Sequence, residues 1–140
     1  MPMTTAARAI ALASQFGDDA STVAPSTLYF ALFDADPGGA GVEPDSTGAY
    51  ARVAMANDST TWGAIGSSDT QISNVGGAIV WPTSSGVWSI LTELTHWGIF
   101  DNSVGGNLLY SGELLTGITI TGAGDTARIP AGALTIIQEA

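Results

Sequence analysis

The chain has 140 residues, and its 3 basic residues, all arginine, stand against 13 acidic ones, which gives a formal net charge of -10. A chain of this length is expected to fold as one domain with a real core. The absence of cysteine excludes disulfides, thiolate metal ligands and thiol nucleophiles. The acidic balance argues against nucleic acid and anionic membranes as partners. No apolar run approaches the roughly 18 residues of a membrane span.

Charged residues make up only 11% of the chain, against roughly 25% in ordinary globular domains. Glycine, serine, threonine and alanine fill much of the remainder, and such a weakly hydrated surface is suited to being covered. Two interpretations stay open at this point. The chain is either a small, self-sufficient β protein or a subunit whose neighbours cover what charges would otherwise protect.

Residues 1–26 are predicted to form an N-terminal arm and connector. The arm contains the only convincing helical pattern, over residues 4–16, with Thr4 or Thr5 as its cap and Gly17 as its stop. Its apolar face is one narrow stripe. Because so short a helix is not stable alone, we expect it to dock on its own sheet or on another subunit.

Residues 27–140 are predicted to form a single β domain. Short apolar or alternating segments recur about every 8 to 15 residues with turn residues between them, and no helical crossovers are predicted. The predicted strands are residues 28–34, 50–55, 78–81, 86–90, 94–101, 108–110, 117–121, 127–129 and 133–137. This pattern predicts an all-β fold, an antiparallel β-sandwich or jelly-roll-like barrel with a short N-terminal helix.

Two of these segments have the same outline. A shift of 67 positions aligns strand, aspartate and glycine-pair positions of the first with those of the second. The aligned positions are Tyr29 with His96, Phe30 with Trp97, Leu32 with Ile99, Asp34 with Asp101, and Gly38-Gly39 with Gly105-Gly106. The match predicts two related hairpins that face each other.

The sequence offers few groups for catalysis. His96 is the single histidine, and within a strand it is expected to be a hydrogen-bonded structural residue rather than a general base. No nucleophile elbow, phosphate loop or dinucleotide motif is present. The chain is therefore predicted not to be an enzyme, with no catalytic, cofactor-binding or metal-binding residues and no cofactor.

Acidic residues around two loops leave one alternative open. Such carboxylates could supply oxygen ligands for calcium, although aspartate is also common at the start of turns, where its side chain caps the backbone. We favour the turn role because the spacing matches no known ligand loop. The candidates are Asp34, Asp36, Glu43 and Asp45 around the first loop and Asp101 with Asn102 in the second.

Several segments together resemble a family of small tailed-bacteriophage virion structural proteins, often labelled phage tail fibre protein. They are residues 28–33, 50–53, 79–82, 95–101, 106–109, 124–126 and 129–135, with Thr95-His96-Trp97-Gly98-Ile99-Phe100-Asp101 as the most characteristic. The resemblance runs through nearly the whole chain in the same order. It implies a virion component made in the host bacterial cytoplasm, and it transfers no catalytic or binding residue because the shared positions are strands and turns.

Two functions are compatible with this resemblance. The preferred one is a capsid decoration (cement) protein, a homotrimer on the capsid exterior that binds the major capsid protein, with residues 1–16 docking on a neighbouring subunit. The alternative is a tail or fibre module that contributes to host attachment. In that case exposed aromatic residues could contact a glycan, with Tyr29, Trp62, Trp88 and Tyr110 as candidates.

Overall fold

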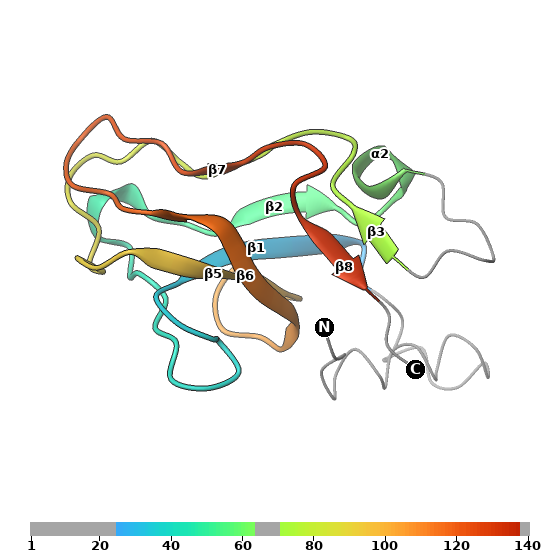
Figure 1. Cartoon of the computed structure of the whole chain (residues 1–140), viewed down its shortest axis with the longest axis horizontal. Coiled ribbons are helices and arrows are strands. Elements are labelled where there is room, and N and C mark those ends of the chain that lie inside the picture. Colours follow the sequence, from blue (N-terminus) through green and yellow to red (C-terminus); the bar gives the residue numbers. More distant parts are fainter. Residues whose placement is uncertain (1–24, 64–70, 138–140) are drawn as a thin grey trace.

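The computed structural model describes residues 25–63 and 71–137, and most of the regular secondary structure in these ranges is antiparallel β-strand (Figure 1). The strands are β1 (Thr27–Phe33), β2 (Val53–Ala56), β3 (Gln71–Ser73), β4 (Ile79–Val80), β5 (Leu94–Phe100), β6 (Leu108–Ile118), β7 (Arg128–Ile129) and β8 (Thr135–Ile137). A 3-10 turn (Thr47–Ala49) and the short helix α2 (Ser59–Trp62) complete the described elements. The predicted helix over residues 4–16 lies outside the described residues.

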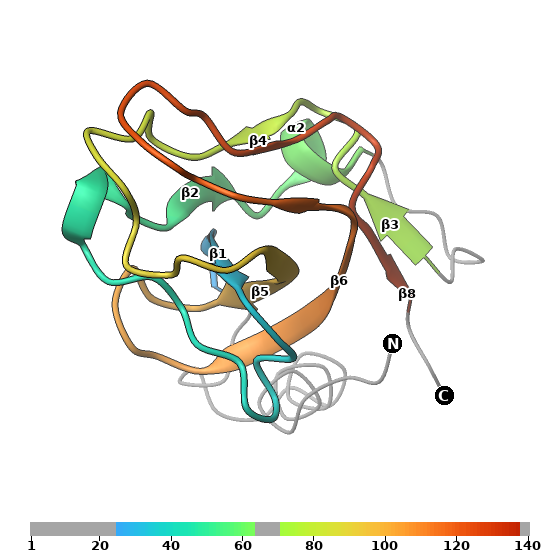
Figure 2. The ribbon, with the colours of Figure 1, turned by 60° about the vertical axis from the view of Figure 1, so that its left-hand side comes forward.

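The strands pair into one four-stranded sheet and two short ladders. The order in the large sheet is β2-β1-β5-β6, and the ladders are β3-β8 and β4-β7, all antiparallel. Figure 2 shows the ladders forming a second layer beside the large sheet. Within residues 25–63 and 71–137 the strands do not close into a barrel. The predicted all-β antiparallel fold is confirmed.

The main core lies between these two layers and contains all four tryptophans. Strands β1 and β5 contribute large apolar side chains from one face of the sheet, and the ladder strands contribute isoleucines from the opposite layer. The large members with almost no exposed surface are Phe30, Leu32, Ile79, Trp81, Trp88, Leu94, Ile99 and Leu134. Burial of this apolar surface is the dominant stabilising contribution to the fold.

Strands β1 and β5 are hydrogen-bonded neighbours, and their pairing explains the internal sequence match. Ala31 lies directly opposite Gly98, its own counterpart under the shift of 67 positions. Tyr29 pairs with Phe100, and their counterparts under the same shift, His96 and Phe33, also pair with each other. The two strand-and-turn units are therefore related by an approximate two-fold axis through the Ala31–Gly98 pair, and they face each other as predicted.

The aspartates that follow the two strands have equivalent roles. The Asp34 carboxylate accepts a hydrogen bond from the Val42 amide at 2.7 Å, and the Asp101 carboxylate accepts one from the Asn107 amide at 2.7 Å. In each case the aspartate amide also donates to the carbonyl of the same partner. Each aspartate thus closes the loop that begins at its own strand.

Some predicted elements differ from those observed. The predicted strand at residues 108–110 and the start of the one predicted at 117–121 are joined in one long strand, β6, which pairs with β5 through residue 113 and again at Ile118. Residues 119–121 lie outside this strand. The segment 86–90 is not a strand. Its apolar pattern instead reflects burial of Trp88, which packs edge-on against Tyr50 and donates to the Gly48 carbonyl.

The loop around Trp62 also contains an unpredicted helical turn, α2. The Asp58 carboxylate accepts a hydrogen bond from the Thr60 amide and caps its first turn. Trp62 lies at its end and is buried. This indole donates to the Asn57 side chain at 3.1 Å, so the tryptophan pins the loop to the domain.

The cross-strand pair Trp97 and Gly112 gives a stability test. A methyl group on Gly112 would lie 2.7 to 3.0 Å from atoms of the buried Trp97 ring, so that ring would have to shift from its packed position. We expect Gly112→Ala to lower the free energy of unfolding by about 1 to 3 kcal/mol in chemical denaturation. Gly122→Ala, where no atom lies within 4 Å, is the matched control. Equal stability of the two variants would contradict this packing.

Candidate functional site

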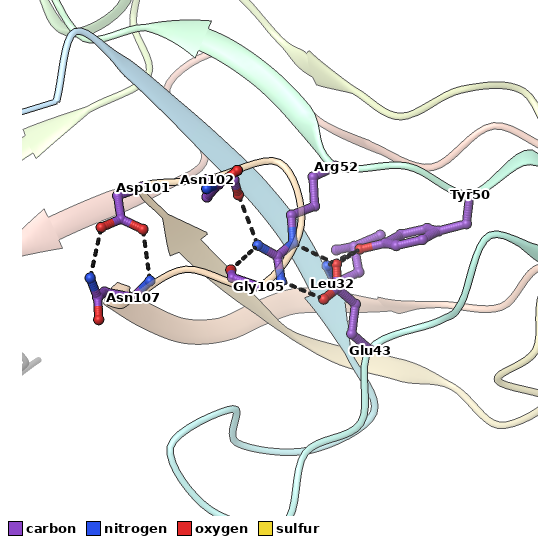
Figure 3. A network of polar contacts seen from close by, with 8 residues as sticks. All are labelled: Leu32, Glu43, Tyr50, Arg52, Asp101, Asn102, Gly105 and Asn107. Atoms are coloured by element: carbon purple, nitrogen blue, oxygen red, sulfur yellow. Dashed lines mark hydrogen bonds and ion pairs between the residues drawn. The ribbon is translucent and has the colours of Figure 1, made fainter.

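The most elaborate polar cluster joins the loops that follow β1 and β5, and Arg52 is at its centre (Figure 3). Arg52 stands immediately before β2. Its guanidinium donates through Nε and Nη2 to the two carboxylate oxygens of Glu43, at 2.9 and 2.7 Å. The side chains are only 7% (Arg52) and 21% (Glu43) exposed. This bidentate, largely desolvated ion pair is of the stronger kind found in proteins.

The third nitrogen of the same guanidinium, Nη1, holds the second loop. Nη1 donates to the carbonyl oxygens of Asn102 at 2.9 Å and of Gly105 at 2.8 Å. The Cζ atom also lies 3.8 Å from the centroid of the Phe100 ring, a cation–π contact. Arg52 therefore ties the loop over residues 34–52 to the loop over residues 101–107.

Tyr50 anchors the cluster to the sheet. The Tyr50 hydroxyl donates to Glu43 Oε1 at 2.8 Å and accepts a hydrogen bond from the Leu32 amide of β1 at 3.1 Å. Burial raises the pKa of Tyr50 well above its ordinary value, and the negative charge of Glu43 raises it further. We call the set Glu43, Tyr50 and Arg52 the loop clamp.

Beside the loop clamp is a surface depression of about 510 Å³, with walls from both loops. Its lining includes Asp45, Ser46, Ser103 and the exposed Val104. The clamp carboxylate is occupied by Arg52 and Tyr50, so it is not free to act as a general base or to coordinate a cation. The arrangement holds two loops in one shape.

The aspartates considered as calcium ligands act as turn caps, and Glu43 pairs with Arg52. Asp36 accepts a hydrogen bond from the Gly38 amide and Asp45 from the Thr47 amide, while Asp34 and Asp101 close their loops as described. The Thr47 bonds lower the pKa of Asp45. Among the residues that the structure describes, no group of three or more acidic or histidine side chains could hold a metal ion. The turn interpretation accounts for these aspartates.

His96 is hydrogen-bonded, as expected of a structural residue. Its Nδ1 lies 2.8 Å from the Thr95 hydroxyl, which in turn donates to the Asp34 carbonyl. Its Nε2 lies 3.8 Å from a carboxylate oxygen of Glu113. These contacts hold β5 beside the end of β1.

The aromatic residues considered for glycan contact lie mostly in the core. Trp62 is 6% exposed and Trp88 is 1% exposed, so neither presents a ring face to solvent. Tyr29 and Tyr110 are half-buried and pack against the apolar clusters. The expectation that Trp62 and Trp88 could stack on a sugar is therefore wrong, because packing of the domain takes up both rings.

Sequence reasoning missed the loop clamp. Glu43 and Arg52 are nine positions apart in a segment rich in turn residues, which gives no periodic signal. One clue was available in the scarcity of cations. Arg52 lies within the predicted strand 50–55, and with 13 acidic residues against 3 arginines it is expected to have an acidic partner.

The loop clamp predicts an asymmetric response to removing one negative charge. Glu43→Gln leaves a buried guanidinium without its counter-charge, and we expect the free energy of unfolding to fall by about 3 kcal/mol. Asp45→Asn removes the same charge from a fully exposed neighbour and should leave stability close to wild type. Chemical denaturation of both variants measures the difference. Similar values for the two variants would show that the ion pair is not a stabilising contact.

Tyr50 predicts a loss of stability in alkali. Its pKa is raised in the folded state, so an unfolded tyrosine, with a pKa of about 10, releases its proton first. The contribution of Tyr50 to the free energy of unfolding should therefore be fully present below about pH 10 and be lost as pH rises above it. Tyr50→Phe should flatten that slope, although burial also raises the pKa of Tyr110 and leaves a smaller slope in place. An unchanged slope would contradict the buried position of the hydroxyl.

The comparisons with known proteins place the chain in a family. No helix in the described ranges is long and apolar enough to cross a bilayer. No curated protein matches the chain. A family model described as Podophage GP4 fiber I protein gp80 matches residues 2–137, nearly the full length. The chain therefore belongs to the podophage GP4 fiber I protein gp80 family and is a structural protein of a bacteriophage virion.

Proposed function

We propose that this chain is a structural subunit of a podophage fibre and contributes to host attachment by building that fibre. The observation that carries the proposal is the family match over residues 2–137, whose description names a fibre protein. The capsid-decoration function preferred from the sequence has no comparable support. The fibre alternative is therefore the better one.

The arrangement of polar groups suits a structural role. The carboxylates of Glu43, Asp34 and Asp101 and the ring of His96 are engaged in hydrogen bonds that fix loops and strand ends. We propose that the protein has no catalytic activity. Its neighbours in the virion would be copies of itself and other virion proteins rather than nucleic acid, because a chain of charge -10 is repelled by phosphates.

The two loops joined by the loop clamp support a role in assembly. A loop held by Arg52 in one conformation loses little further conformational entropy when a neighbouring subunit covers it. Aromatic stacking on a host glycan has no support from Trp62 or Trp88, which are buried. The proposed contribution to attachment is therefore indirect, through the fibre that carries the receptor-binding surface.

Location in the particle tests the proposal. Gold-labelled antibodies against the purified chain should mark fibres in electron micrographs of intact virions, and the purified chain should bind isolated tails rather than undecorated capsids. Label spread evenly over the head, with saturation of capsids at a fixed copy number, would overturn the fibre assignment and restore the decoration function.

The same binding assay tests the predicted docking of residues 1–16. Deletion of these residues should weaken attachment to the particle at least tenfold while leaving the β domain folded by circular dichroism, since ~1.4 kcal/mol of lost contact is enough for that change. Undiminished binding of the truncated chain would show that the segment is not a docking element.

A further inference from the structure

A groove opens between β6 and the segment that contains β7 and the turn before β8. Two adjoining hollows of about 390 and 400 Å³ share Trp97, Glu113, Leu115 and Ala133, so they form one continuous depression. Apolar atoms provide most of its lining. We call this depression the β6 groove. Its size is in the range of sites that hold part of a partner molecule.

An irregularity in β6 creates one wall of the groove. His96 pairs with Glu113 and Leu94 pairs with Ile118, so residues 114–117 of β6 have no partner in the β5 register. The strand bulges there, as edge strands often do where they meet a partner or a site. The backbone of this bulge faces no other strand among the described residues.

The bulge also makes a protruding apolar contact. Leu115 is 91% exposed, the highest value among the large apolar side chains of the described residues, and it stands at the lip of the groove. A single exposed leucine is ordinary on a protein surface. Here the exposed leucine lies directly beside an apolar groove. When two copies meet through this surface, the leucine of each can enter the groove of the other.

Charge identifies the occupant. The groove has one carboxylate on the β6 side, Glu113, and one guanidinium on the β7 side, Arg128. The residues that line the groove carry no net charge in a chain of charge -10, although the Glu93 carboxylate lies against the lining residue Gly117. Repulsion between two copies is therefore weaker here than the net charge of the chain would give. The opposite signs also allow Glu113 of one copy to pair with Arg128 of another.

We propose that the β6 groove is the contact surface for a second copy of this chain, with Leu115 of each copy inserted into the groove of its neighbour and Glu113 paired with the neighbour's Arg128. The inference rests on the proposed function in one respect, namely that copies of the chain are neighbours in the fibre. Because the protruding leucine and the groove belong to one patch, the contact is reciprocal and closes a pair around a two-fold axis.

The first test is the mass in solution. Sedimentation of the full chain over a range of concentrations, in moderate salt that screens the repulsion between chains, should show a reversible oligomer. Leu115→Asp should weaken association at least ~10-fold by placing a carboxylate in an apolar hollow. Leu91→Asp is the matched control, since Leu91 is 75% exposed and does not line the groove. A monomer at every concentration, or equal loss in the two variants, would overturn the proposal.

A charge exchange provides the decisive test. Glu113→Arg and Arg128→Glu should each weaken association about 10-fold, because each brings like charges together across the contact. The double variant should recover association to within about 3-fold of wild type, which a merely structural role of either residue would not produce. Circular dichroism of all variants establishes that they fold. No recovery in the double variant would overturn the Glu113–Arg128 pairing.

The outcome is separable from that of the proposed function. Self-association through the β6 groove with antibody label on the head would remove the fibre role and keep this contact. Label on fibres together with a monomeric chain in solution would keep the fibre role and remove the proposed contact.

Discussion

The pairing of β1 with β5 is the interaction on which the rest of the structure depends. Both strands are buried on both faces, so each must be paired along its length and covered on two sides. One face packs Phe30, Leu32 and Ile99 against the ladder layer, while on the other Phe33 and Phe100 stack at 5.9 Å over Gly98. The remaining strands extend or cover this pair.

The approximate two-fold axis through that pair makes the loop clamp informative. The two loops have equivalent hydrogen bonds to their aspartates, yet a single arginine connects them. The position equivalent to Arg52 under the shift of 67 is Thr119, so the second unit has no matching arginine. Because Arg52 is one of only three basic residues, its contact with both loops is not simply the result of many basic residues on the surface. Four of its five N–H donors bind one carboxylate and two backbone carbonyls.

Periodicity and turn residues were sufficient to predict the all-β fold, the two central strands and their relationship, because these depend on local patterns. The continuity of β6 could not be predicted, since Gly112 and Gly117 resemble turn residues until Trp97 and Glu93 are known to lie over them. The burial of Trp62 and Trp88 and the pairing of Glu43 with Arg52 depend on contacts between loops. No single stretch of sequence encodes such contacts.

The negative net charge and the apolar β6 groove have opposite effects on the association of two copies. A net charge of -10 keeps separate copies apart over distances up to a Debye length, about 8 Å at physiological salt. Attraction between copies must therefore come from short-range apolar contact at a surface whose lining residues carry no net charge, and the β6 groove has both properties. In the proposed fibre each such contact need only be modest. Simultaneous attachment at several contacts raises the total affinity far above that of one, so the long-range repulsion would limit association of free chains while the assembled fibre stays stable.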